Sequence, residues 1–338
     1  MYSTGEVVAA FYNIKAYNGF KAYQMNWIDT GTIDSYVKIR NNKHSLPKTT
    51  GECLYRLQDT CDSCGKETNA RCVKLFPQDI SNKIKRINYL KPFLPNIKTK
   101  GNHVISYNWV SGKTLYEVDD MNVYKSFVQW ANKNLWKRVD CENFSDLCDK
   151  FYRQKTQNRV EQYLAEATSA ELSSVNGKKC GSVYDCLEMI DWNALEHIPT
   201  NLFHGDLQFD NVIYNKSNNF TMIDWRDDFG GSSDYGDVYY DLAKMYGGTL
   251  INYREMRDNV NANVSYWDFN VSLTLEDNSK NLVELRNSGW LENWLIDNSF
   301  DVRTVKILTA LIFLNMSPLH EQPFSDYLFY RGKEMLYD

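Results

Sequence analysis

The sequence predicts an α+β protein with two lobes, a small antiparallel β lobe followed by a larger, mostly helical lobe. A chain of 338 residues is long for one hydrophobic core, so two lobes are the natural expectation. The runs 52–57 and 70–76 have the pattern of paired antiparallel strands. In 121–139 and 146–167, apolar and aromatic residues recur at steps of three and four, as expected for helices with one buried face.

Composition narrows the class of protein. Hydrophobic residues make up 43% of the chain and aromatic residues 14%, which favours a well-packed globular protein. The net charge of -5 provides no basic field, so we expect no nucleic-acid partner. The run 307–314 is much shorter than the ~20 residues of a membrane span, and residues 1–6 do not resemble a secretion signal. We therefore expect no membrane insertion and a cytoplasmic location.

The most informative run is 203–211, with the sequence FHGDLQFDN. A loop that presents Asp206 to a hydroxyl group can accept its proton, and the amide oxygen of Asn211 can bind a magnesium ion without adding negative charge. Two apolar runs, 212–214 and 220–223, flank a polar turn and should form a hairpin. That hairpin would return Asp224 to the neighbourhood of Asn211, where a carboxylate can bridge the ion to two phosphates.

The order H-x-D-L-x-x-x-N matches the catalytic loop of protein kinases, with Gly205 where those enzymes carry arginine. Because Asp224 is followed by tryptophan rather than by Phe-Gly, the segment resembles the aminoglycoside phosphotransferase and choline kinase superfamily. This resemblance implies a bilobal, protein-kinase-like fold, ATP and Mg²⁺ as cofactors, and a small-molecule acceptor. We place the small lobe at 46–112 and the large lobe at 113–338, with the catalytic loop at 203–226.

The resemblance also implies a role for each residue of the loop. Asp206 would be the catalytic base, and Asn211 and Asp224 would hold the metal. His204 and Asp241 would support the loop, since the run GDVYYDLA that contains Asp241 looks like the helix start that braces this loop in the family.

The nucleotide side of the site is less complete. Lys74 lies in the middle of a predicted strand, where the family's ATP-binding lysine would lie. The segment 79–95, which should supply a helix with a glutamate for that lysine, contains no glutamate, so Asp79, Glu67 or Glu52 would have to substitute. The expected adenine-binding residues form the hinge between lobes: Tyr107, Asn108, Trp109 and Val110.

The acceptor side is expected to be acidic and aromatic. Four aspartates follow Asp224 closely and could attract a cationic or polyhydroxyl acceptor: Asp227, Asp228, Asp234 and Asp237. Aromatic residues nearby could stack on a sugar or surround a quaternary amine, or simply pack in the core: Trp225, Tyr235, Tyr239 and Tyr240. Of these two groups, we single out Trp225, Asp227, Asp228 and Tyr235 as candidate substrate contacts.

The first 45 residues have a different character. The run 26–36 resembles the closing segment of sugar-nucleotide pyrophosphorylases, so 1–45 is either a nucleotidyltransferase remnant or an N-terminal decoration. A nucleotidyltransferase partner or fused domain would favour a sugar or sugar alcohol of surface polysaccharide synthesis, in capsule or lipopolysaccharide, as acceptor. The alternatives are a choline, ethanolamine or aminoglycoside kinase and, in another class, a catalytically weak scaffold that binds nucleotide.

Four cysteines raise the question of a metal site. A hairpin turning at residues 62–63 would set Cys53 opposite Cys72 and bring Cys61 near Cys64. Four thiolates in that arrangement could bind zinc, although the spacing lacks the usual paired C-x-x-C motifs. The alternative is that Cys53 and Cys72 are small buried strand residues.

Overall fold

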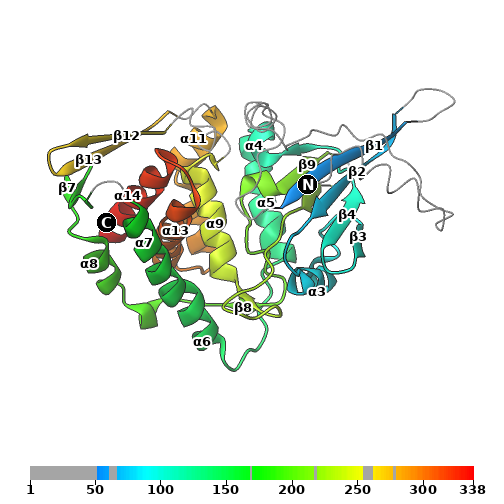
Figure 1. Cartoon of the computed structure of the whole chain (residues 1–338), viewed down its shortest axis with the longest axis horizontal. Coiled ribbons are helices and arrows are strands. Elements are labelled where there is room, and N and C mark those ends of the chain that lie inside the picture. Colours follow the sequence, from blue (N-terminus) through cyan, green and yellow to red (C-terminus); the bar gives the residue numbers. More distant parts are fainter. Residues whose placement is uncertain (1–51, 61–66, 168–169, 217–218, 254–261, 277–278) are drawn as a thin grey trace, which may run out of the picture. The chain divides into compact units, whose positions relative to one another are not determined.

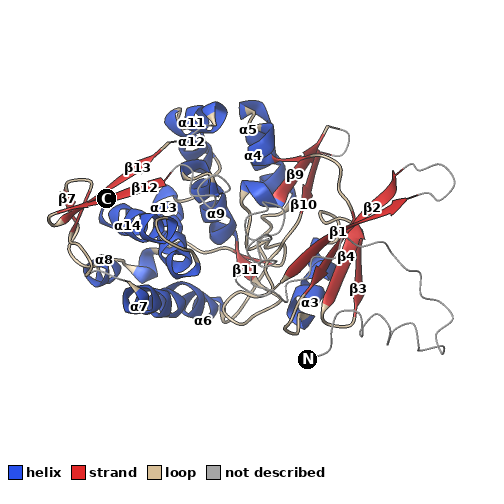
Figure 2. Ribbon diagram, turned by 45° about the horizontal axis from the view of Figure 1, so that its top comes forward, coloured by secondary structure: helices blue, strands red, loops and turns tan. Residues whose placement is uncertain are grey.

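The computed structural model describes most of the chain, namely residues 52–60, 67–167, 170–216, 219–253, 262–276 and 279–338. These form two compact units, shown in Figure 1 and taken one at a time below. The first contains the described residues up to Asp79 together with Ile97–Trp109, and the second contains Ile80–Asn96 and Val110–Asp338. The α+β prediction is confirmed, because strands dominate the first unit and helices the second (Figure 2). The predicted nucleotidyltransferase-like segment 1–45 lies outside the described residues.

The first unit is a four-stranded antiparallel sheet with strand order β1-β2-β4-β3. Its strands are Cys53–Thr60 (β1), Glu67–Leu75 (β2), Ile97–Lys100 (β3) and Val104–Asn108 (β4). The predicted antiparallel pairing of the first two strands is confirmed. Alternate residues of β2, Cys72 and Lys74, are buried, as the two-residue period of a strand requires, and Phe76 just after the strand continues the pattern. Lys74 is therefore held on the buried face of the sheet.

The register of β1 and β2 corrects the expected cysteine pairing. Cys53 pairs with Leu75, and Cys72 pairs with Arg56, so the prediction that Cys53 lies opposite Cys72 is wrong. An irregularity between Leu57 and Asp59 shifts the register. The paired residues of the two strands are centred at a later position in the chain than residues 62–63. Cys61 and Cys64 lie outside the described residues, and the zinc hypothesis loses the pairing on which it depended.

In the second unit, a small sheet carries the candidate catalytic loop. Its strands, in the order β10-β9-β5, are Lys113–Thr114 (β5), Val212–Asn215 (β9) and Asn219–Met222 (β10). The predicted hairpin is confirmed, with Met222 paired to Val212. The Ile223 backbone N–H donates to the Asn211 carbonyl at 2.9 Å, which extends this pairing towards the loop. A second short pair joins Pro199–Thr200 (β8) to Gly236–Asp237 (β11).

Helices form most of the rest of the second unit. They are Ser81–Leu90 (α3), Leu115–Val118 (α4), Met121–Asn134 (α5), Phe144–Cys148 (α6), the π-helical Asp149–Gln154, Lys155–Glu166 (α7), Val183–Glu188 (α8), Val238–Leu250 (α9), Lys280–Asn287 (α11), Trp290–Asp297 (α12), Val302–Met316 (α13) and Phe324–Tyr337 (α14). The core is built on α9, α13 and α14, which lie side by side in Figures 1 and 2. All residues of α9 except Leu250 are buried.

The apolar composition of α13 suits this central position. Asp301 caps its first turn by accepting the Thr304 backbone N–H at 2.7 Å. Val302–Leu319 is, among the described residues, the one helical stretch long and apolar enough to span a membrane, and 56% of it is buried inside the protein. That burial is typical of a core helix.

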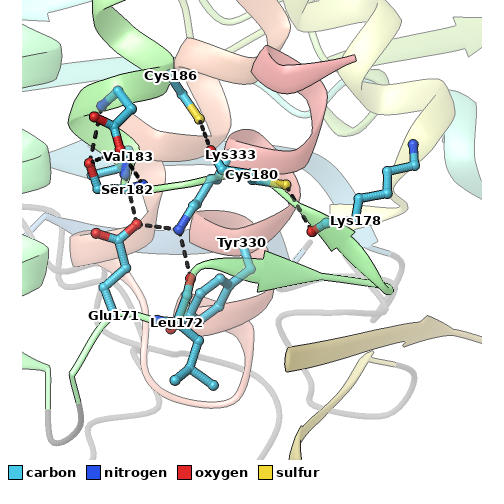
Figure 3. Close-up of polar contacts among 10 residues, drawn as sticks. Glu171, Leu172, Lys178, Cys180, Ser182, Val183, Cys186, Tyr330 and Lys333 are labelled. Carbon is cyan, nitrogen blue, oxygen red and sulfur yellow. Dashed lines mark hydrogen bonds and ion pairs between the residues drawn. The ribbon is translucent and has the colours of Figure 1, made fainter. Parts of the chain in front are cut away.

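A sheet of short and longer strands lies beside the C-terminal helix. In the order β12-β13-β6-β7, its strands are Ser174–Val175 (β6), Lys178–Lys179 (β7), Ala262–Trp267 (β12) and Asn270–Leu275 (β13). The segment preceding β6 is attached to α14 by Lys333, whose side chain is fully buried. Its ammonium group donates to the Glu171 carboxylate and to the Leu172 carbonyl (Figure 3). This ion pair anchors α14 to the segment before β6.

Candidate active site

One carboxylate of α9 holds the catalytic loop through hydrogen bonds to the loop backbone. Asp241 accepts the backbone N–H of His204 at 2.9 Å and that of Gly205 at 2.7 Å. Burial raises the pKa of Asp241 to about 7, while the two N–H donors and Arg86 favour its charged form. Asp241 thus fixes the two peptide groups that directly precede Asp206.

His204 joins the loop to the end of the hairpin. One ring nitrogen, Nε2, lies 3.0 Å from the Ile223 carbonyl, and Nδ1 accepts the Asp206 backbone N–H at 3.2 Å. A neutral imidazole can donate at one nitrogen and accept at the other. Burial lowers the pKa of His204 to about 4, which keeps the ring neutral at physiological pH. A single buried side chain therefore connects the residues on both sides of the candidate metal site.

Gly205 explains why this loop departs from the protein-kinase pattern. Its backbone has φ +79°, a conformation that glycine adopts without steric cost. A Cβ at this position would lie 2.4 Å from the Arg226 Cβ and 2.6 Å from a ring atom of Phe203. No side chain fits there, so the arginine of protein kinases is excluded by packing.

Asp206 has a different partner at each carboxylate oxygen. The Asn211 side-chain amide donates to Oδ2 at 2.9 Å and to the Asp206 carbonyl at 2.8 Å. The Lys244 ammonium lies 2.9 Å from Oδ1. Burial opposes ionisation of Asp206, but Lys244 outweighs it and holds the pKa of Asp206 below its ordinary value. Asp206 is therefore charged at neutral pH and can accept a proton.

Asp224 follows β10 in a left-handed backbone conformation with φ +62°, which is uncommon outside glycine and concentrates at functional sites. The backbone bond from Ile223 to Asn211 brings Asp224 to the end of the loop that carries Asn211, and the charge of Asp224 raises the pKa of the Asp206 carboxyl. Lys83 of α3 lies 3.9 Å from Asp224 Oδ1 and donates to the Trp225 carbonyl. The structure thus gathers Asp206, Asn211 and Asp224 around the end of the hairpin.

The donor atoms suit magnesium. Mg²⁺ prefers oxygen ligands and is commonly held by one or two carboxylates together with substrate phosphates. With the Asn211 amide nitrogen directed at Asp206, its amide oxygen is the atom that would bind the ion, beside the Asp224 carboxylate. When bound there, the ion would neutralise negative charge on the phosphates.

Lys74 belongs to the first unit and has a partner within it. Its ammonium lies 3.4 Å from Glu52 Oε1, and both side chains are nearly buried. Glu52, one of the three acids proposed to replace the missing helix glutamate, thus pairs with Lys74. The side chain of Glu67 is not described, and Asp79 accepts a hydrogen bond from Asn102 at 3.0 Å.

The four expected adenine-binding residues span the boundary between the units, which falls between Trp109 and Val110. Tyr107 is buried in β4, where it pairs with Cys72. Asn108 is exposed, and the half-exposed Trp109 ring lies 4.5 Å from the Arg56 guanidinium.

The candidate substrate contacts differ in their surroundings. Trp225 is only 2% exposed, and its ring N–H donates to the Lys83 carbonyl at 2.9 Å, so this residue packs against α3. Asp227 is exposed and Tyr235 partly exposed. Asp228 accepts the Gly231 backbone N–H at 3.0 Å and so closes a turn.

The other two aspartates of the expected acidic region also have structural partners. Asp234 pairs with Lys85 at 2.7 Å and accepts the Tyr89 hydroxyl. Asp237 is fully buried, caps α9 and lies 2.6 Å from His197. Asp234 is thus paired with a lysine of α3, and Asp237 serves as a helix cap.

Four cations at the site escaped the sequence analysis: Lys83, Arg86, Arg226 and Lys244. Arg86 of α3 is buried and donates to the carbonyls of Phe203 and Ser233. Burial lowers the pKa of Arg86 to about 10, against the opposing effect of Asp241. Helical spacing in the sequence was the available signal for three of them. Lys83 precedes Arg86 by three positions and Lys244 follows Asp241 by three, so each pair lies on one helix face.

Comparisons with known proteins agree with this chemistry. The sequence model of the phosphotransferase enzyme family matches residues 106–269, a segment that contains the loop, the hairpin and Asp241. No curated protein matches the chain in a sequence comparison.

Three solved structures are similar to this chain in fold. An ethanolamine kinase of Plasmodium vivax is 12% identical, with 89% of this chain and 85% of that chain covered and a TM-score of 0.46. A choline kinase of Cryptosporidium parvum is 14% identical, with coverage of 83% and 88% and a TM-score of 0.37. A spectinomycin phosphotransferase in complex with ADP and spectinomycin is 11% identical, with coverage of 84% of each chain and a TM-score of 0.33.

The family match falls on the part of the chain in which the loop, the hairpin and the supporting helix come together. The fold is the predicted α+β, protein-kinase-like one. Residues 106–269 carry the sequence pattern of the phosphotransferase enzyme family, and the chain is a phosphotransferase.

Proposed function

We propose that this protein transfers the γ-phosphoryl group of ATP, with Mg²⁺, to a hydroxyl group of a sugar or sugar alcohol. The observation that carries this proposal is the environment of Asp206. One oxygen faces Asn211 and the other Lys244, and the field of Asp224 acts on the same carboxylate. An ionised base beside an amide and a second carboxylate is the arrangement that direct phosphoryl transfer uses.

In the proposed reaction, the acceptor hydroxyl oxygen forms a bond to the γ-phosphorus while the bond from that phosphorus to the β,γ-bridging oxygen breaks. The electron pair of the broken bond leaves with ADP, and the hydroxyl proton passes to Asp206. Asp206 can take it because Lys244 keeps the carboxylate charged. Asn211 and Asp224 are assigned to the metal, and Asp241 with His204 keeps the loop in its bent conformation. Positioning and charge stabilisation then supply the rate enhancement.

Most nucleotide contacts in this proposal come from the first unit, and Val110 belongs to the second. Lys74 is assigned to the α- and β-phosphates, with Glu52 orienting its ammonium group. Tyr107, Asn108, Trp109 and Val110 are assigned to adenine. A sugar or sugar alcohol is proposed as acceptor because 26–36 resembles the closing segment of a nucleotidyltransferase. The phosphorylated product would be made in the cytoplasm for surface polysaccharide. A nucleotidyltransferase that activates the phosphorylated product is the partner this implies.

A catalytically weak scaffold is the competing class of function. It is tested by thermal unfolding with ATP, in the presence and absence of Mg²⁺. A ligand at 100 times its Kd stabilises the folded state by about 2.7 kcal/mol, which raises Tm by several degrees. The enzyme proposal expects this shift only when Mg²⁺ is present. An equal shift without Mg²⁺, or none in either condition, would reject the proposed metal-dependent transfer.

A further inference from the structure

A lysine of α3 lies beside one of the candidate metal ligands. The Lys83 ammonium is 3.9 Å from Asp224 Oδ1, and the two side chains are 14% and 21% exposed. This separation is longer than a hydrogen bond and longer than the 2.9 Å between Lys244 and Asp206. The ammonium group is therefore close to the Asp224 carboxylate, and both side chains remain accessible to a ligand.

Lys83 is held in this place by a reciprocal pair of bonds with Trp225. Its ammonium donates to the Trp225 carbonyl, and the Trp225 ring N–H donates to the Lys83 carbonyl at 2.9 Å. The ammonium also lies 5.4 Å from the centre of the Trp225 ring, within the range of a cation–π contact. Because Trp225 directly follows Asp224, these contacts fix the ammonium beside the Asp224 carboxylate.

The helix that carries Lys83 is itself attached to the catalytic loop and its hairpin. Arg86, three positions after Lys83 and on the same helix face, donates to the Phe203 carbonyl. Just after the helix, the Phe93 carbonyl accepts the Met222 backbone N–H at 2.8 Å. α3 also belongs to the same compact unit as the loop. Its lysine is thus already ordered, which lowers the entropy lost when it binds a ligand.

α3 lies in the segment that was expected to supply a glutamate for Lys74. The segment has no glutamate, and Lys74 instead pairs with Glu52 at 3.4 Å. α3 therefore presents a different charge to the site. That charge is positive, and it lies at the end of the hairpin beside Asp224.

The surroundings of Lys83 point to phosphate as its ligand. Asp224 is assigned to the ion that neutralises the terminal phosphates of ATP, so groups beside Asp224 are placed for contact with the same phosphates. A lysine ammonium is a compact point charge and a common phosphate ligand. Since phosphoryl transfer depends mainly on positioning and charge stabilisation, a fixed cation there would contribute to both.

We infer that Lys83 binds the β- or γ-phosphate group of ATP. This inference rests on the proposed function, because it uses the assignment of Asp224 to the metal. It adds a second phosphate-binding cation to Lys74, and this one comes from the unit that carries the catalytic loop. Two competing roles are attachment of α3 through Trp225 and occupation of the metal's place beside Asp224.

The experiment compares ATP with AMP, which has the same adenosine and α-phosphate but lacks the two terminal phosphates. Binding of each nucleotide to the full chain with Mg²⁺ is measured by calorimetry. Transfer of labelled phosphate from ATP to a panel of sugars and sugar alcohols gives kcat and KM. Lys83→Gln should weaken ATP binding about 10- to 100-fold and leave AMP binding unchanged, as expected for the loss of one charge-assisted contact.

Two further variants assign the effect to the charge of Lys83. Lys83→Arg keeps the charge and should recover most of the lost ATP affinity. Lys85→Gln removes the same charge from the same helix, at an exposed ion pair with Asp234, and should bind ATP as the wild type does.

The outcomes separate this inference from the function beneath it. Equal weakening of ATP and AMP binding in Lys83→Gln would assign Lys83 to the attachment of α3 and overturn the inference. Tighter binding of ATP with Mg²⁺ in that variant would mean that the ammonium competes with the metal, and it would overturn the inference as well, as would wild-type affinity for ATP. In these cases transfer by the wild type leaves the proposed function standing. A wild-type protein that shows neither Mg²⁺-dependent ATP binding nor transfer to any acceptor overturns both.

Discussion

Asp241→Asn tests how the catalytic loop is supported. The wild-type carboxylate accepts two buried N–H groups, at 2.9 Å from His204 and 2.7 Å from Gly205. An asparagine has one carbonyl oxygen, so one of these donors would face an NH₂ group and remain unsatisfied. A buried unsatisfied donor costs about 1–3 kcal/mol, and the bond that remains loses its charge assistance. We therefore expect a loss of about 3 kcal/mol in the free energy of unfolding.

Turnover should fall as well, because the two peptide groups involved directly precede Asp206. If about half of the lost free energy bears on the active conformation of the loop, kcat falls roughly tenfold. The assay combines urea unfolding with labelled phosphate transfer, and Asp297→Asn at an exposed position of α12 is the control. Wild-type stability and turnover in Asp241→Asn would refute the bracing role.

Three further outcomes follow from named contacts. Burial lowers the pKa of His204 from its ordinary 6.5 to about 4, so the stability it contributes above pH 6.5, on the order of 3 kcal/mol, is lost as pH falls through 4. Urea unfolding at several pH values checks this, and His204→Gln should flatten that part of the profile; an identical profile would contradict it. Gly205→Ala should cost roughly 1–3 kcal/mol from backbone strain alone and abolish turnover by displacing Arg226, and wild-type behaviour would show that the loop is more tolerant than its φ of +79° indicates. Lys333→Ala should destabilise by about 3–5 kcal/mol because it leaves a charged partner unpaired in the interior, whereas Lys178→Ala, at an exposed ion pair, should have little effect; equal effects would argue against the buried anchor.

The catalytic loop and its hairpin could be predicted because their signals are local. The spacing of Asp206, Asn211 and Asp224 lies within one loop and one hairpin, and the hairpin forms with the expected strands. The pairing of the first two strands was predictable for the same reason, but their exact register was not, since it shifts at an irregularity between Leu57 and Asp59 that no turn or spacing signal in the sequence marks.

The contacts of the cations at the site depend on tertiary packing and were not predictable, even where the spacing of the cations along a helix is visible in the sequence. Arg86 contacts the Phe203 carbonyl across 117 positions of the chain, and no local pattern specifies that contact. The acidic acceptor side stays a prediction, although some of its aspartates also have structural partners. Short aspartate side chains readily bind nearby backbone N–H groups, and Asp228 and Asp237 are used in this way for a turn and a helix cap.

The measurement that tests the account most directly is Mg²⁺-dependent transfer of labelled phosphate from ATP by wild-type protein and by Asp224→Asn, with a panel of sugars and sugar alcohols as acceptors. Asp224→Asn keeps the side-chain shape but removes the charge assigned to the metal. The account predicts transfer by the wild type and by Asp297→Asn, and nearly complete loss in Asp224→Asn. Undiminished turnover in Asp224→Asn would contradict it.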